Sequence, residues 1–134
     1  MHINLKLFFE SGNILIVEDD ETSAFLLSEY LRQFNATIII ASSCSQALDK
    51  LTNLTDLKLA LLDIRLSDGC GKEIARHIKS TLPSTIIIGQ TALTQENVSS
   101  LEKLGLFNSF LIKPITEKEL LEEISKQITT HLKL

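Results

Sequence analysis

Five polar residues of this chain each stand at the end of a short apolar run. They are Asp63, the acid pair Glu18 and Asp19, Thr91, and Lys113. Three carboxylates brought close together repel one another by about 4 kcal/mol per pair at an effective dielectric constant near ~20. A lysine and a hard divalent cation offset such repulsion, and Mg²⁺ prefers carboxylate and carbonyl oxygens as ligands. These residue types therefore predict an acidic, cation-binding site, provided that the fold brings the ends of the runs together.

The apolar runs have the length and composition of buried β-strands. A run that is apolar throughout suits a strand covered on both faces, as in the middle of a parallel sheet. Residues 14–17, 38–41, 59–62, 86–88 and 109–112 are the predicted strands.

Apolar residues at helical spacing follow each predicted strand and indicate five amphipathic helices. Two of these helices begin at capping-box patterns, Ser43–Gln46 and Thr116–Glu119. The fourth helix has the thinnest apolar stripe, formed by Val98, Leu101 and Leu104. The predicted helices lie at about residues 24–34, 43–54, 74–82, 95–104 and 116–132.

The regular alternation of strand and helix predicts an α/β fold, a doubly wound five-stranded parallel sheet of the (βα)5 type. Crossovers between parallel strands are right-handed, so helices cover both faces of the sheet. Because the carboxyl ends of parallel strands lie along one rim, we expect the five polar residues to gather there. Residues 1–12 precede the first strand as an extension that ends in a turn-like segment.

Composition excludes several other classes of protein. The chain has 134 residues, 44% of them hydrophobic, and a net charge of −4, which fits one folded domain and not a broad nucleic-acid binder. No apolar run approaches the ~20 residues needed to span a bilayer. Two cysteines are too few for a disulfide framework. We therefore expect a soluble, cytoplasmic protein that contacts neither nucleic acid nor membrane directly.

The strand-end residues resemble those of the receiver domain of two-component response regulators. The matching pieces are Ile-Val-Glu18-Asp19, Leu-Leu-Asp63, Thr91-Ala92 and Lys113-Pro114, each in order and each after its own strand. The resemblance covers roughly residues 13–132. It implies a chemotaxis-regulator-like, flavodoxin-like sheet with strand order 2-1-3-4-5, residues 13–134 as the receiver domain and residues 1–12 as an N-terminal extension.

The resemblance also implies a chemistry for the rim. Asp63 would accept a phosphoryl group from a phosphohistidine and become an acyl phosphate. Glu18, Asp19, Asp63 and the main-chain carbonyl of Arg65 would bind Mg²⁺. Such a domain is a regulator and not an enzyme, beyond catalysing its own phosphorylation and dephosphorylation.

Lys113 and the Thr91 hydroxyl would bind the phosphoryl oxygens, and the resemblance implies a cis peptide bond between Lys113 and Pro114. Thr91 and Phe110 would form the switch that reports phosphorylation. The implied partners are a sensor histidine kinase or histidine phosphotransfer protein, and a downstream target or second copy. The last two would bind through the fourth helix, fifth strand and fifth helix, near Leu106 and Phe107.

Other interpretations stay open at this point. A haloacid-dehalogenase-like phosphohydrolase also uses an aspartate after a strand, but needs a second aspartate two residues later, where this chain has Arg65. A flavodoxin-like binder cradles phosphate after its first strand, where four consecutive acids would repel it. Asp19 and Asp20 could be the metal pair instead of Glu18 and Asp19, although continuity of the first strand through Val17 favours the latter.

Overall fold

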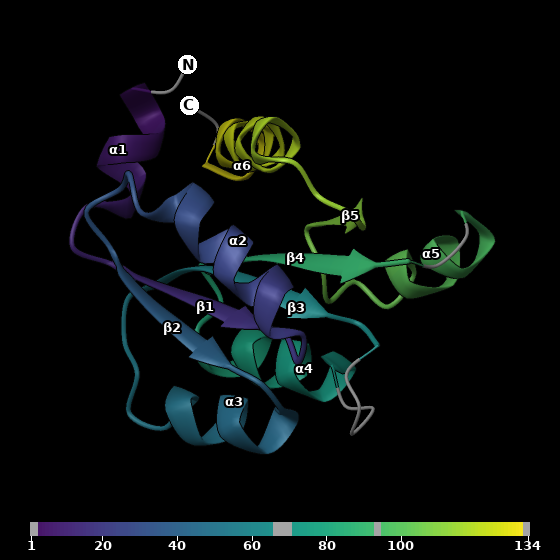
Figure 1. Ribbon diagram of the computed structural model, residues 1–134. Coiled ribbons are helices and arrows are strands. Elements are labelled where there is room, and N and C mark those ends of the chain that lie inside the picture. Colours follow the sequence, from purple (N-terminus) through teal and green to yellow (C-terminus); the bar gives the residue numbers. More distant parts are fainter. Residues whose placement is uncertain (1–2, 66–70, 93–94, 133–134) are drawn as a thin grey trace.

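A five-stranded parallel sheet forms the centre of the protein (Figure 1). The computed structural model describes residues 3–65, 71–92 and 95–132. The strand order is β2-β1-β3-β4-β5, as predicted. The strands span Asn13–Val17 (β1), Thr37–Ala41 (β2), Leu57–Asp63 (β3), Ile86–Thr91 (β4) and Ser109–Ile112 (β5).

Helices cover both faces of this sheet. In Figure 1, α1, α2 and α6 lie on one face and α3 and α4 on the other, while α5 lies near the carboxyl ends of β4 and β5. The helices of the described residues are Ile3–Phe9 (α1), Glu21–Leu31 (α2), Cys44–Leu51 (α3), Gly71–Thr81 (α4), Gln95–Glu102 (α5) and Glu117–Leu132 (α6).

The two faces of the sheet bury two separate hydrophobic clusters. Side chains alternate along a strand, so Ile14 and Ile16 of β1 pack beneath α1, α2 and α6. Leu15 and Val17 of the same strand pack against α3 and α4. Burial on both faces is the reason why the central strands β1, β3 and β4 are mainly apolar, whereas the edge strands β2 and β5 are partly exposed.

The weak stripe of the fourth predicted helix corresponds to a short α5. Val98 and Leu101 are buried, at 8% and 9% exposure. Leu104, which helical spacing predicts to be buried, is 43% exposed because α5 ends at Glu102 and Leu104 lies beyond it.

The segment before the first strand is a helix that joins the core. Leu5 and Phe9 of α1 are fully buried in the cluster beneath α2 and α6. The Phe9 ring lies 4.9 Å from the Phe34 ring. After α1, the Ser11 backbone N–H donates to the Asn35 carbonyl at 2.6 Å. The alternation of polar and apolar residues in this segment concealed the helix, since Leu5 and Phe9 are four residues apart and share one face.

Candidate functional site

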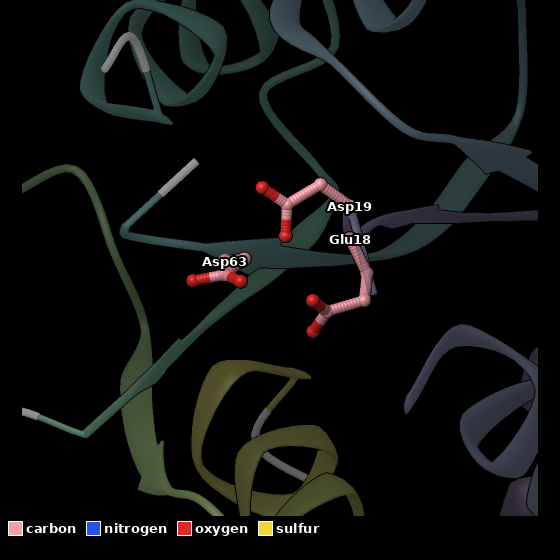
Figure 2. A group of neighbouring side chains, drawn as sticks. All are labelled: Glu18, Asp19 and Asp63. Atoms are coloured by element: carbon pink, nitrogen blue, oxygen red, sulfur yellow. The ribbon is translucent and has the colours of Figure 1, made fainter. Parts of the chain in front are cut away.

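The carboxyl ends of β1 and β3 bring three carboxylates together (Figure 2). Oxygen atoms of Glu18, Asp19 and Asp63 all lie within 4.8 Å of one another. β1 pairs directly with β3, with Val17 opposite Leu62, so the residue that follows each of these positions reaches the same point on the rim. The predicted meeting of these residues is confirmed by the geometry.

Glu18 is a buried carboxylate that is paired through both of its oxygens. Its side chain is buried, and its Oε2 accepts a hydrogen bond from the Asp20 backbone N–H at 3.1 Å. Its Oε1 lies 2.8 Å from Lys113 Nζ in an ion pair. Burial raises the pKa of Glu18, and the nearby charge of Asp63 adds to the increase, while Lys113 and the Asp20 N–H offset part of it.

Asp63 is held on both carboxylate oxygens. Oδ1 accepts a hydrogen bond from the Arg65 backbone N–H at 2.9 Å, and Oδ2 accepts one from Lys113 Nζ at 2.8 Å. The side chain is 6% exposed. Asp63 is thus fixed in orientation at the end of the central strand while its carboxylate still faces Glu18 and Asp19.

Lys113 reaches the site from two strands away. β4 lies between β5 and β3, so the side chain crosses the end of β4 to contact Asp63 and then Glu18. The Lys113–Pro114 peptide bond is cis, as predicted. Burial alone would lower the pKa of Lys113, but the hydrogen bonds and charges of Asp63 and Glu18 raise it above its usual value. The lysine is therefore a cation that two carboxylates hold in its protonated form.

The acid that follows the pair has a separate, structural role. Asp20 is the N-cap of α2, and its Oδ2 accepts hydrogen bonds from the Ser23 N–H at 2.8 Å and the Ser23 hydroxyl at 2.7 Å. These hydrogen bonds lower the pKa of Asp20. Its oxygens are not part of the carboxylate group, so the geometry favours Glu18 with Asp19 over the pairing of Asp19 with Asp20.

The two predicted switch residues lie on neighbouring strands. Thr91 is fully buried at the end of β4, and its carbonyl accepts a hydrogen bond from the Lys113 N–H at 2.8 Å. Phe110 lies in β5 opposite Gly89 and is half-buried. Thr91 shares the rim with the carboxylates, whereas Phe110 lies further back along its strand.

One polar residue of the rim was missed by the sequence analysis. Gln90 is 1% exposed, and its Nε2 has no hydrogen-bond partner among the described residues. It is opposite Asp63 in the β3–β4 register and, with Lys113, lines a groove of about 330 Å³ between α2 and the turn after β5. A glutamine that interrupts an apolar strand was the available signal.

The donor set suits a hard divalent cation. All three side chains offer carboxylate oxygens, and these lie within 4.8 Å of one another. Mg²⁺ takes such oxygen ligands and keeps several of its waters, which the exposed Asp19 allows on the outer side. The residues therefore fit a metal site.

A family model settles the identity of the domain. The response regulator receiver domain matches residues 14–125. The chain belongs to this family. The receiver domain functions in two-component signal transduction, and neither the phosphohydrolase nor the flavodoxin-like interpretation is supported.

Known proteins similar to this receiver domain include sensor kinases and regulators. It is 32% identical over 120 residues to the autoinducer 2 sensor kinase/phosphatase LuxQ of Vibrio vulnificus, which covers 89% of this chain and 14% of LuxQ. It is 26% identical over 118 residues to the sensor protein TorS of Escherichia coli, covering 88% of this chain and 13% of TorS. The chain thus spans only a small part of these relatives.

Solved structures share the fold. A CheY-like receiver domain protein from Methanospirillum hungatei superposes with a TM-score of 0.78 at 28% identity, covering 92% of this chain and 98% of the other. A BeF3-activated DrrB receiver domain gives a TM-score of 0.73 at 28% identity, covering 87% and 96%. In the part of this receiver domain that the structure describes, no helix is long and apolar enough to cross a membrane.

Proposed function

We propose that Asp63 is the phosphoacceptor and takes a phosphoryl group from a phosphohistidine of a sensor histidine kinase or a histidine phosphotransfer protein. The observation that carries this proposal is the position of Asp63 among the carboxylates. It is buried, oriented by the Arg65 N–H and Lys113, and adjacent to the Glu18–Asp19 pair. The relatives that are sensor kinases and regulators support the choice of partner.

The transfer exchanges one bond to phosphorus for another. A carboxylate oxygen of Asp63 attacks phosphorus and forms a P–O bond, while the P–N bond to the donor histidine breaks. Its electron pair returns to the imidazole nitrogen, which then takes up a proton from water. Phosphoryl transfer depends mainly on positioning and charge neutralisation. Lys113 Nζ supplies a fixed positive charge 2.8 Å from the acceptor carboxylate, and the Thr91 hydroxyl is the proposed ligand of a further phosphoryl oxygen.

Mg²⁺ is the proposed cofactor of this step, and when bound it supplies the positive charge that neutralises the phosphoryl group. Glu18, Asp19, Asp63 and the main-chain carbonyl of Arg65 are its proposed ligands. The close approach of the three carboxylate groups supports this assignment. The domain catalyses its own phosphorylation and dephosphorylation and has no further substrate.

Phosphorylation of Asp63 would be signalled to a binding partner through the face formed by α5, β5 and α6. Ile112 of β5 is 53% exposed there, and a groove of about 350 Å³ lies between α5, β5 and α6. This groove is lined by Val98, Phe110 and Lys126, among others. A downstream target or a second copy of the chain is the proposed occupant. Chemical-shift mapping with and without beryllofluoride tests it, and changes restricted to α2 would contradict it.

We place the domain in the cytoplasm, where receiver domains are typically found. Cys44 is nevertheless disulfide-bonded in the structure, and cytosolic thiols are normally kept reduced. Thiol titration of protein purified anaerobically from the cytoplasm tests this placement. Two reactive thiols after denaturation support it, since the chain has two cysteines, and a persistent disulfide contradicts it.

Labelling by acetyl phosphate in the presence of Mg²⁺ tests the proposed function. Wild type should form an acid-stable, base-labile phosphoprotein, and chelation of Mg²⁺ should prevent it. Asp63→Asn should abolish labelling, because the amide has the same shape but is not a nucleophile. Asp20→Asn is the matched control, since asparagine retains the N-cap and Asp20 lies outside the carboxylate group. Full labelling of Asp63→Asn would refute the assignment.

A further inference from the structure

Gly89 provides the space in which the Phe110 ring lies. Residues 89 and 110 are opposite each other in the β4–β5 register, so both face the α3–α4 side of the sheet, as Ile87 does. A Cβ atom at residue 89 would lie 2.7 Å from Cδ1 and 2.8 Å from Cε1 of Phe110. It would also lie 3.1 Å from Cδ1 of Ile64. The ring therefore occupies volume that any residue other than glycine would fill.

A second aromatic residue covers the same ring. The Phe107 and Phe110 rings have centroids 4.9 Å apart and planes inclined by 40°. Phe107 is itself packed against the hydrophobic cluster beneath α3 and α4. Its neighbour Asn108 is anchored to β4, because its N–H donates to the Ile87 carbonyl and its Oδ1 accepts from the Ile87 N–H, both at 2.7 Å. The segment that carries Phe107 is thus fixed relative to Gly89.

We propose that Gly89, Ile64 and Phe107 form a seat that fixes the resting position of the Phe110 ring, with Gly89 as its positioning residue. This inference rests on the proposed function and on the switch role that the family resemblance implies for Phe110. The Phe110 ring packs against the backbone of Gly89 on one side and against the Phe107 ring on another, so moving it requires the loss of both contacts. The seat thus sets how far the ring moves when Asp63 is phosphorylated.

Adding a single methyl group at residue 89 should displace the Phe110 ring and leave the backbone in place. The atoms closest to the added Cβ belong to the end of the Phe110 side chain, which can rotate, and to the tip of Ile64. Gly89→Ala should therefore push the Phe110 ring toward solvent. Removing the ring as well, in Gly89→Ala with Phe110→Ala, should relieve the clash, so that the two substitutions are less destabilising together than the sum of their separate effects.

Fluorine NMR of protein labelled with 4-fluorophenylalanine measures both the seat and the site in one spectrum. The chain has six phenylalanines, and Phe110→Leu identifies the Phe110 resonance by its disappearance. In Gly89→Ala, the Phe110 resonance should shift, and its H₂O–D₂O isotope shift should increase to that of an exposed ring. Phe107→Leu should shift the same resonance by removing the ring stacked on it.

Beryllofluoride with Mg²⁺ separates this inference from the proposed function. Bound beryllofluoride has its own fluorine resonance, which should persist in Gly89→Ala because residue 89 is not part of the carboxylate group. A persistent bound resonance with an unshifted Phe110 resonance would overturn the seat and leave the proposed function standing. Absence of the bound resonance from wild type would count against the proposed function. Additive stability losses in the double variant would also overturn the seat.

Discussion

The two ends of the same sheet are built in opposite ways. At the amino end, α1 closes the cluster beneath α2 and α6 with Leu5 and Phe9, both fully buried, and with the Phe9–Phe34 ring contact. The buried Thr85 hydroxyl, just before β4, donates to the Leu57 carbonyl at 2.8 Å. The amino end of the sheet therefore gains apolar burial from α1.

At the carboxyl end, charged and polar groups are buried together at the acidic site. Glu18 and Gln90 are both 1% exposed, and the Gln90 Nε2 has no hydrogen-bond partner among the described residues. Leaving such an atom unpaired costs about 1–3 kcal/mol, and the burial of Glu18 raises the pKa of its carboxyl group. This fold therefore gains stability from apolar burial at the amino end and loses some of it at the carboxyl end, where polar and charged groups are buried to form the acidic site.

The largest change in the free energy of unfolding should come from a substitution at the amino end of the sheet. Phe9→Ala should lower the free energy of unfolding by about 3–5 kcal/mol, because it removes a fully buried aromatic side chain and leaves a cavity. Leu7→Ala is the matched control on the same helix, since Leu7 is 74% exposed, and it should change stability by less than about 0.5 kcal/mol. Urea unfolding measures both. Equal effects would mean that α1 does not belong to the core.

Binding of Mg²⁺ to the acidic site should change the free energy of unfolding by a smaller amount. Mg²⁺ at about 100 times its dissociation constant should stabilise the fold by about 2.7 kcal/mol, because it binds the assembled carboxylates only in the folded state. Thermal unfolding with and without Mg²⁺ measures this. The double variant Glu18→Gln with Asp19→Asn should lose the stabilisation. If the full Mg²⁺-dependent shift remained, the metal site would lie elsewhere.

Relief of repulsion at the carboxyl end should have a smaller effect, of opposite sign to Phe9→Ala. Glu18→Gln should stabilise the metal-free protein at neutral pH by on the order of 1 kcal/mol, since it removes one of three neighbouring like charges. Glu21→Gln is the control, because Glu21 is exposed in the first turn of α2. A destabilised Glu18→Gln protein would show that the ion pair with Lys113 outweighs the repulsion.

The same residue should produce a pH dependence of stability. Its folded pKa is raised above the ordinary value of 4.5, mainly by burial, so the folded state binds a proton more tightly than the unfolded chain does. The resulting stabilisation is present below about pH 4.5 and is lost as the pH rises through the folded pKa. Glu18→Gln should remove this loss. Denaturant titrations across that range compare the two proteins, and identical pH profiles would contradict the burial of Glu18.

Sequence reasoning predicted the carboxyl end better than the amino end. Strand-length apolar runs defined the sheet, and parallel strands bring their carboxyl ends to one rim, so Asp63 and Glu18 could be placed on the same rim without coordinates. The adjacency of the first and third strands, which brings the two residues side by side, was implied by the resemblance to the receiver family. A seven-residue helix such as α1 has little intrinsic stability and depends on tertiary packing. Its local pattern is therefore a weak signal.

Residue roles that depend on the register between neighbouring strands could not be predicted from the sequence either. The space above Gly89 has meaning only once Phe110 is known to lie opposite it, and that follows from the β4–β5 pairing. Gln90 likewise becomes notable through its position beside Asp63 and its unpaired amide nitrogen. Loop chemistry and apolar periodicity carry no information about such cross-strand neighbours.

Borohydride trapping after incubation with acetyl phosphate and Mg²⁺ tests the central claim most directly. Borohydride reduces an aspartyl phosphate to homoserine, so the acceptor is marked in the chain and can be located by peptide mass spectrometry. We predict homoserine at residue 63, and none at Asp19 or Asp20. Homoserine at another residue, or an unmodified Asp63 in protein that has been shown to carry phosphate, would contradict the account.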